Sequence, residues 1–192
     1  MFATIKKDFE RYYSIEVGSK NPGLIRKNRL LLQTPGIHAL IIYRFGKWLT
    51  KDGGASGILQ LFKPVYLLLN FFIEKLYDIR ISQDANIAPG FYVGHFAGIE
   101  IGLCTIGKNC SVHQHVKICP DKSAGSSTQK TLQIGCNVWI GSHSIIDCDL
   151  QITDGVTIAA GSVVTNDIET PSMVMGNPAR IVKANYDNSG LL

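Results

Sequence analysis

The sequence predicts a mainly β fold with an α-helical part: a left-handed parallel β-helix preceded by a small helical N-terminal domain. Two observations support this prediction. Aliphatic residues recur at every sixth position after about residue 80, and before that point apolar residues recur at steps of three and four. The composition agrees with a globular chain, because 45% of the 192 residues are hydrophobic and only 18% are charged, which excludes disorder.

The first 80 residues have the periodicity of helices. Residues 37–49, which follow a Pro-Gly pair, predict one helix, and an earlier helix is predicted by the spacing of Ile5, Phe9, Tyr12 and Tyr13. The segment 51–57, KDGGASG, predicts a break. A third apolar helix is expected over 58–76, kinked or started at Pro64. Because its apolar residues lie on all sides, we expect it to contact the rest of the chain, another subunit or lipid, with a subunit contact favoured.

The step of six belongs to neither a helix nor an alternating strand. It is typical of a hexapeptide-repeat solenoid, in which each coil has three short flat faces and places one aliphatic side chain per face in a narrow core. Three repeats complete a coil, so about four to five coils are expected, with a left hand that departs from the usual crossover rule. The repeat positions are Ile81, Ile87, Val93, Ile99, Ile106, Val112, Ile118, Ile134, Ile140, Ile146, Ile152, Ile158 and Val164.

The breaks in this phase predict where the chain leaves the coils. One residue is inserted between Ile99 and Ile106, and the step from Ile118 to Ile134 is sixteen residues. The segment 119–131, CPDKSAGSSTQKT, is polar and rich in Ser and Gly, so it predicts a protruding loop. Such a loop is either a substrate contact or a tolerated surface insertion.

The charge balance and the cysteines limit the class of protein. A net charge of +4 is too weak to indicate nucleic acid, but it fits a polyanionic cofactor or an anionic membrane face. The cysteines are odd in number and lack CxxC spacing, so we expect reduced thiols without a disulfide framework or a zinc ribbon. They are Cys104, Cys110, Cys119, Cys136 and Cys148.

Neither a secretion signal nor a membrane span is predicted. The first residues, MFATIKKDFERYY, lack an uninterrupted apolar segment and a small-residue cleavage site. The most apolar stretch, 58–73, is shorter than the roughly 20 residues of a membrane helix and contains Lys63 and Pro64. We therefore expect a cytoplasmic protein, with peripheral contact at the inner face of the membrane as an open alternative.

Four motifs resemble those of one protein family: GHFAGI (94–99), IGCNVWIGSHSII (134–146), IAAGSVV (158–164) and GNPARIV (176–182). On these motifs the chain resembles the serine acetyltransferases among the hexapeptide-repeat acyltransferases. The resemblance implies three parts: a helical N-terminal domain (1–78), a β-helix acyltransferase domain (79–183) and a C-terminal tail (184–192). It also implies acetyl-CoA as the acyl donor, no metal, and a homotrimer with active sites between neighbouring prisms. Whether trimers pair through the helical domain is left open.

The family's catalytic histidine corresponds to His95. An alcohol is a poor nucleophile until a base removes its proton, and an imidazole titrates near neutral pH. His95 is therefore expected to act as the general base that takes the proton of the acceptor hydroxyl during attack on the thioester, and then to return it to the leaving thiolate. A structural histidine is the plainer alternative.

The resemblance also implies contacts with acetyl-CoA. Gly141, Ser142 and Ala160 match small residues along which the family binds the pantetheine arm through backbone atoms. Arg180 and Lys183 follow the last coil, where cations would either meet the CoA phosphates or simply face solvent.

The chain departs from the family around the catalytic histidine. The family's acidic partner of that histidine is replaced by Arg80, so Asp84 and Asp78 are candidate substitutes. The acidic residue that directly precedes the histidine, and engages the amino acid in serine-specific members, is replaced by Gly94.

The departures continue in the loop. Lys130 and Thr131, the candidate substrate-binding residues, stand where the family has an arginine and a histidine that serves the substrate carboxylate. A site without these contacts should hold free serine poorly, because a buried charge without partners is costly. We therefore expect an O-acetyltransferase acting on a sugar hydroxyl in surface polysaccharide biosynthesis. Serine O-acetyltransferase activity in cysteine biosynthesis is the alternative.

Two further functions use the same kind of coil. A γ-type carbonic anhydrase would bind zinc through three histidines, for which His113, His115 and His143 are available, although their spacing differs from that family's. A non-catalytic β-helix scaffold would explain the change at Arg80. No cysteine has an adjacent activating histidine in the sequence, so we expect the cysteines to pack within the coils.

Overall fold

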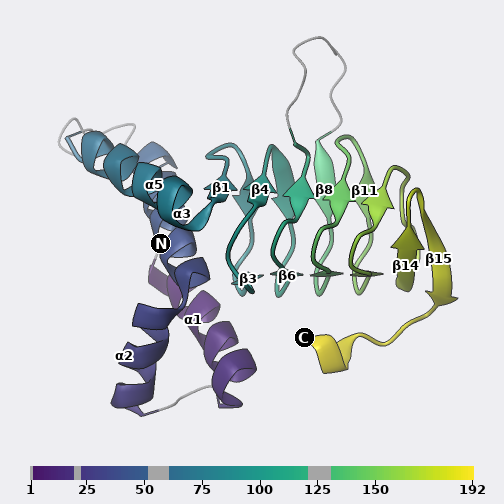
Figure 1. Ribbon diagram of the computed structural model, residues 1–192, viewed down its shortest axis with the longest axis horizontal. Coiled ribbons are helices and arrows are strands. Elements are labelled where there is room, and N and C mark those ends of the chain that lie inside the picture. Colours follow the sequence, from purple (N-terminus) through teal and green to yellow (C-terminus); the bar gives the residue numbers. More distant parts are fainter. Residues whose placement is uncertain (1, 20–22, 52–60, 121–130) are drawn as a thin grey trace, which may run out of the picture.

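The structure, a computed structural model, describes residues 2–19, 23–51, 61–120 and 131–192. Helices gather at one end of a straight solenoid whose coils follow one another along the long axis (Figure 1). The predicted class, a helical part followed by a left-handed parallel β-helix, is confirmed. The described helices are α1 (Phe2–Val17), α2 (Leu24–Gln33), α3 (Pro35–Lys51) and α5 (Lys63–Tyr77).

Three sheets form the sides of a prism. The first sheet contains β1 (Ile79–Ile81), β4 (Ile99–Ile101), β7 (Lys117–Ile118), β10 (Ile145–Ile146) and β13 (Val163–Val164). The second contains β2 (Asn86–Ile87), β5 (Cys104–Ile106), β8 (Leu132–Ile134) and β11 (Gln151–Ile152). The third contains β3 (Tyr92–Val93), β6 (Ser111–Val112), β9 (Trp139–Ile140), β12 (Thr157–Ile158), β14 (Ser172–Gly176) and β15 (Ala179–Ala184).

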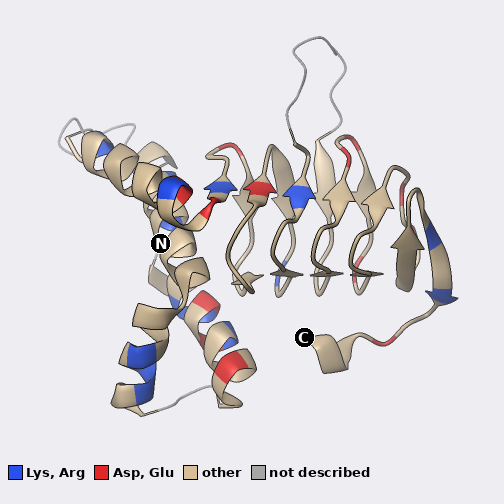
Figure 2. Ribbon diagram, viewed as in Figure 1, with Lys and Arg blue, Asp and Glu red and all other residues tan. Residues whose placement is uncertain are grey.

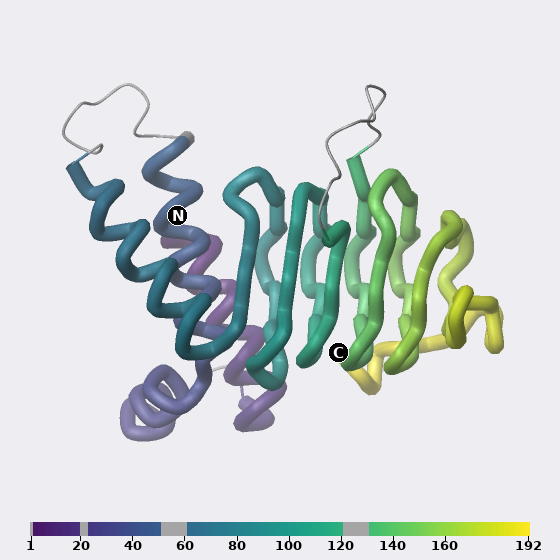
Figure 3. The backbone as a smooth tube through the Cα atoms, turned by 45° about the horizontal axis from the view of Figure 1, so that its top comes forward, coloured from purple at the N-terminus to yellow at the C-terminus, as the bar shows by residue number. Residues whose placement is uncertain are grey.

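Strands pair in parallel with the strand one coil away, so that Ile118 is in register with Ile101 and with Ile146. The last strand, β15, runs antiparallel to β14 and ends the third sheet. The chain then returns beneath the prism (Figures 1 and 3), where Asn188 Nδ2 donates a hydrogen bond to the carbonyl oxygen of Asn137 at 2.8 Å. A short 3₁₀ helix, η2 (Ser189–Leu191), lies near the C-terminus.

All thirteen predicted repeat positions lie in the core. Ile81 is 8% exposed, and the other twelve are 3% exposed or less. Burying an aliphatic side chain of this size contributes roughly 2 kcal/mol to stability. The six-residue step is thus confirmed as the spacing at which one aliphatic side chain per face enters the prism.

Two of the three predicted helices correspond to α1 and α3. The third, predicted over 58–76, corresponds to α5, which begins at Lys63. Pro64 lies in its first turn, where the missing N–H of proline breaks no intrahelical hydrogen bond. Most of the predicted break lies at 52–60, outside the described residues. On α5, Ile73 is buried, whereas apolar side chains such as Leu67 and Phe71 are more than half exposed. Of the described helices, none is long and apolar enough to cross a membrane.

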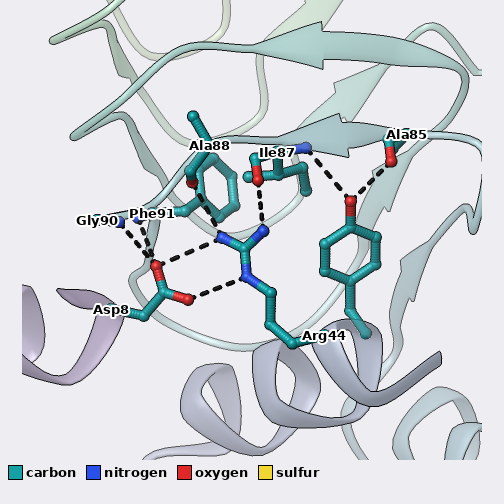
Figure 4. A network of polar contacts seen from close by, with 8 residues as sticks. Asp8, Arg44, Ala85, Ile87, Ala88, Gly90 and Phe91 are labelled. Carbon is teal, nitrogen blue, oxygen red and sulfur yellow. Dashed lines mark hydrogen bonds and ion pairs between the residues drawn. The ribbon is translucent and has the colours of Figure 1, made fainter. Parts of the chain in front are cut away.

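A buried ion pair joins the helices to the first coil (Figure 4). Arg44 Nε of α3 donates to Asp8 Oδ2 of α1 at 3.0 Å, and the side chains are 8% and 6% exposed. Asp8 Oδ1 accepts from the backbone N–H groups of Gly90 at 2.8 Å and Phe91 at 3.1 Å. Arg44 also donates to two carbonyl oxygens of the same segment. Burial raises the pKa of Asp8 and Arg44 opposes that shift. The pair therefore fixes α1 and α3 to the open end of the prism.

Cys119 and Cys148 form a disulfide, with their Cα atoms 4.6 Å apart. The expectation of five reduced thiols is therefore wrong for these two residues. They follow β7 and β10, which are neighbours in the first sheet, so stacking of the coils brings them together. Their separation of 29 residues includes the inserted loop and hides this proximity in the sequence. The remaining cysteines, Cys104, Cys110 and Cys136, are free.

Candidate active site

His95 lies in the turn 94–98 between β3 and β4, and its side chain is exposed. The glycines of this turn are required by the next coil. A Cβ atom at Gly94 would lie 2.7 Å from His113 Nδ1, and one at Gly98 would lie 2.2 Å from His115 Nδ1. Gly98 also has a positive φ of 63°, which favours glycine. The two histidines therefore occupy the space that side chains at these positions would need.

His95 lines a cleft of about 680 Å³. The cleft lies between the turn and the helices, with Glu16 of α1 and both Arg26 and Arg29 of α2 in its wall. α2 carries basic residues and no acidic ones (Figure 2). The volume falls in the range of about 300–1,000 Å³ that small-molecule sites have. An exposed imidazole, a carboxylate and two guanidinium groups thus share one cleft.

Three rings on successive coils support the turn. The His113 ring lies 6.4 Å from that of Tyr92 and 4.8 Å from that of Trp139, measured between centroids. The Tyr92 hydroxyl donates to Glu16 Oε1 at 2.5 Å, and burial together with this carboxylate raises the pKa of Tyr92. Burial, assisted by the nearby His95, lowers the pKa of His113, so its ring is neutral at neutral pH. His113 is therefore a packed neutral residue beside the exposed imidazole.

Asp78 and Asp84 are the two acidic residues expected to support His95, and of these Asp78 is hydrogen-bonded to the turn that carries His95. Asp78 caps the C-terminus of α5, and its Oδ2 accepts from the N–H of Gly98 at 3.0 Å. Asp84 is exposed in the turn between β1 and β2, at a different edge of the prism from the turn between β3 and β4. Within one chain, the fold therefore brings Asp78 and not Asp84 to the His95 turn.

Arg80 has acidic partners of its own. It lies on β1 and forms ion pairs with Glu74 of α5 at 3.9 Å and with Glu100 of β4 at 3.7 Å. Glu100 is directly opposite Arg80 in the parallel register of the two strands. Arg80 thus forms a surface ion pair with Glu100 of the next coil.

The expected acetyl-CoA contacts lie on the same prism edge as His95. This edge is formed by the turns that connect the third sheet to the first, and Gly141, Ser142 and Ala160 lie in two of them. Successive turns are hydrogen-bonded, as where the Gly161 N–H donates to the Ser142 carbonyl at 2.8 Å. A Cβ atom at Gly141 would lie 2.6 Å from the Ala160 nitrogen. Close stacking of the coils therefore requires a small residue at 141, whatever binds outside.

Arg180 and Lys183 are exposed on β15, at the end of the third sheet opposite β3. Five strand spacings of about 4.8 Å separate β3 from β15, or about 24 Å. Lys183 Nζ lies 5.3 Å from the centroid of the Tyr186 ring. Only an elongated ligand lying along the prism would contact both these cations and His95.

Thr131 is not brought to His95 within one chain. Thr131 lies just before β8, at the edge between the first and second sheets, whereas His95 is at the edge between the third and the first. Lys130 lies outside the described residues. Contact between Thr131 and His95 would require a second subunit.

The histidines considered for a zinc site and the buried cysteines take part in the packing of the coils. Among the described residues, no three His, Cys, Asp or Glu side chains are grouped to hold a metal ion. The rings of His115 and His143 stack with centroids 4.6 Å apart. Burial raises the pKa of Cys104 and of Cys110 to about 12, which leaves both as unreactive thiols near neutral pH.

Three charged residues of the cleft are absent from the sequence-based prediction: Glu16, Arg26 and Arg29. The last two lie on α2, a helix that the periodicity did not reveal because its apolar residues stand in two blocks, at 24–25 and 30–32, and not at steps of three and four. A weaker signal was present, since residues 24–33 form a proline-free run that ends just before Thr34-Pro35. That signal places a helix but does not show that it faces His95.

Sequence comparisons agree with the hexapeptide repeats. Residues 132–166 match the protein family described as bacterial transferase hexapeptide (six repeats). The serine acetyltransferase of Synechococcus elongatus is 28% identical over 95% of this chain and 69% of its own length. That of Escherichia coli is 28% identical over 86% of this chain and 58% of its own length. The chain thus spans roughly three fifths to two thirds of these relatives.

Solved structures agree with the fold. Serine acetyltransferase of Vibrio cholerae matches with a TM-score of 0.75 and 24% identity, over 97% of this chain and 67% of that one. Soybean serine acetyltransferase complexed with serine matches with a TM-score of 0.73 and 26% identity, over 94% and 68%. The names of these relatives agree with the predicted resemblance to serine acetyltransferases and give no support to a polysaccharide-associated variant. The chain therefore contains hexapeptide repeats and is similar in sequence and in fold, along nearly its whole extent, to serine acetyltransferases.

Proposed function

We propose that this chain transfers the acetyl group of acetyl-CoA to a hydroxyl group, with His95 as the general base. The observation that carries the proposal is the position of His95: an exposed imidazole in the wall of a cleft of about 680 Å³, on the same prism edge as Gly141, Ser142 and Ala160. The names of the similar proteins support the same reaction.

The chemistry follows from an exposed base beside a small-molecule cleft. A neutral His95 ring accepts the hydroxyl proton while the oxygen bonds to the thioester carbon. The carbon–sulfur bond then breaks, and the thiolate of CoA takes the proton from the imidazolium. Base and acid are the same group, so each turnover restores the ring. Asp78 has a positioning role, since its bond to Gly98 holds the turn on which His95 is carried.

Two acceptors are in competition. Serine is supported by the names of the relatives and by the soybean structure, which is described as complexed with serine. A sugar hydroxyl, the expectation from the sequence, is supported by Gly94, where the neighbouring His113 ring leaves no room for an acidic side chain. The comparisons favour serine over the sugar.

The base is tested by matched substitutions of two exposed histidines. His95→Asn is expected to lower kcat by about 100-fold or more, the usual contribution of a general base. His115→Asn is the control, because His115 is exposed on the next coil and is absent from the lining of the cleft. Equal rates of product formation by His95→Asn and the unchanged protein, measured by mass spectrometry with labelled acetyl-CoA, would show that the proposal is wrong.

We propose in addition that the chain assembles as a homotrimer, in which the loop bearing Lys130 and Thr131 meets the His95 edge of a neighbour. The exposed apolar side of α5 supports an assembly of this kind. Light scattering is expected to give three times the chain mass of 21.0 kDa, or six times if trimers pair through the helices. A monomer at micromolar concentration would contradict the proposal.

A further inference from the structure

The walls of the His95 cleft differ in charge. Arg26 and Arg29 are contributed by α2, whose sequence LIRKNRLLLQ contains no acidic residue. Among the described residues that line the cleft, Glu16 is the only carboxylate. With a neutral His95, the described lining residues therefore carry two positive charges and one negative charge.

The guanidinium groups have few partners within the chain. In the described parts of the structure, the Arg26 side chain has neither an ion pair nor a hydrogen bond, and Arg29 Nε donates a hydrogen bond to Gln33 Oε1 at 3.0 Å. Glu16 already accepts the hydrogen bond of the Tyr92 hydroxyl. The remaining N–H groups of both arginines thus have hydrogen-bonding capacity in a cleft that holds the reactive imidazole.

Guanidinium groups bind phosphate and carboxylate oxygens through paired N–H donors, and two of them three residues apart on a helix face the same side. We propose that Arg26 and Arg29 bind an anionic group of the acceptor, so that the hydroxyl to be acetylated belongs to a phosphorylated or carboxylated molecule. This inference rests on the proposed function, because it takes the His95 cleft as the acceptor site.

The cleft and the edge expected to bind acetyl-CoA are separate surfaces. Arg180 and Lys183, the cations expected to meet the CoA phosphates, lie about 24 Å from the strand that precedes His95, by five strand spacings. Charge on α2 should therefore act on the acceptor and leave acetyl-CoA binding unchanged.

Lys27 provides a matched control on the same helix. Its ammonium group lies 5.8 Å from the centroid of the Tyr13 ring, and it lines a different cleft, which is formed with residues 2–13 of α1 and does not include His95. Lys27→Gln removes the same charge from the same helix with the same substituent as Arg26→Gln and Arg29→Gln, and all three residues favour helix to a similar degree.

The first readout is binding in the absence of acetyl-CoA, by calorimetry. The phosphate probes are glucose 1-phosphate and UDP-glucose, the carboxylate probe is serine, and the neutral partners are methyl glucoside and serinamide. At least one anionic probe should bind about tenfold or more tightly than its neutral partner. The Arg26→Gln/Arg29→Gln double variant should lose that difference, and Lys27→Gln should keep it. Preference for a phosphate probe or for serine identifies the source of the anion.

Steady-state kinetics provide the second readout. The double variant should raise the KM of the anionic acceptor about tenfold while the KM of acetyl-CoA stays within about twofold. The inference is overturned if no anionic probe binds better than its neutral partner, if Lys27→Gln has the same effect as the double variant, or if the change falls on acetyl-CoA. Failure of the proposed function is distinct from these results, because it would appear as absent transfer by a protein that still binds the anionic probe.

Discussion

The Tyr12 hydroxyl of α1 both donates a hydrogen bond to the carbonyl oxygen of Val93, at 2.9 Å, and accepts one from its N–H, at 2.8 Å. Val93 belongs to β3, the first strand of the third sheet, so these bonds occupy the backbone groups of an exposed sheet edge. Val93 also lies two residues before His95. One buried tyrosine thus closes the edge of the prism and fixes the start of the turn that carries the proposed base.

Tyr12→Phe is therefore expected to be costly although it removes a single oxygen atom. Tyr12 is 0% exposed, so the variant leaves the N–H and the carbonyl of Val93 buried without partners, at about 1–3 kcal/mol for each group. Urea unfolding should show a loss of about 2–6 kcal/mol. Tyr13→Phe, one residue along the same helix, is the control and should change stability by less than about 0.5 kcal/mol. Equal stability of the two variants would contradict the role of the Tyr12 hydroxyl.

The Asp8–Arg44 pair should be sensitive to loss of one partner and tolerant of loss of both. Asp8→Asn leaves the Arg44 charge buried without its carboxylate, which is expected to destabilise the fold by about 3–5 kcal/mol. Combining it with Arg44→Met should cost less than the sum of the single changes, because no uncompensated charge remains. Thermal unfolding measures each variant.

A surface pair provides the comparison for this cycle. Lys6 and Glu10 are 4.0 Å apart on the exposed side of α1, and Glu10→Gln should change stability by less than about 1 kcal/mol. A result in which Asp8→Asn costs no more than Glu10→Gln would mean that the buried pair does not hold the helices to the prism.

The β-helix could be predicted residue by residue, because each aliphatic side chain at the six-residue step has one available position, the inside of the prism. Ile140 and Ile158, for example, pair in register and are both 0% exposed. The Cys119–Cys148 disulfide could not be predicted in the same way. Its two ends become neighbours only after the inserted loop is removed from the count, and the length of that insertion has no fixed relation to the repeat.

The site was predictable only in part for a similar reason. His95 was identified by its motif, and the turn places it at the surface as expected. The approach of Asp78 depends on the left-handed conformation at the end of α5, with a φ of 52°, which aims the carboxylate at Gly98. The approach of Arg26 depends on how α2 packs against α3. Neither contact has a short-range pattern in the sequence, because each joins a residue of the helical part to a turn of the β-helix.

The disulfide leads to a prediction about thiol counts. Protein denatured without a reducing agent should take up three carbamidomethyl groups from iodoacetamide, and five after reduction, since three of the five cysteines are free. In the native protein at pH 8, Cys104 and Cys110 should not react, because burial raises the pKa of each to about 12. Mass spectrometry gives the counts. Five groups on the unreduced, denatured protein would show that Cys119 and Cys148 are not joined.

The last prediction concerns the packing of the His95 turn against the following coil. A Cβ atom at Gly94 would lie 2.7 Å from His113 Nδ1, so Gly94→Ala should destabilise the fold by about 1–3 kcal/mol through overpacking. In a His113→Ala background the same change should cost at least about 1 kcal/mol less, because the obstructing ring is gone. Gly190→Ala is the control, since a Cβ atom there would meet no neighbouring atom within 4 Å. Urea unfolding of the single and double variants measures the coupling. Strictly additive costs would mean that His113 is not what keeps position 94 a glycine, and would remove the steric reason for the absence of an acidic residue beside His95.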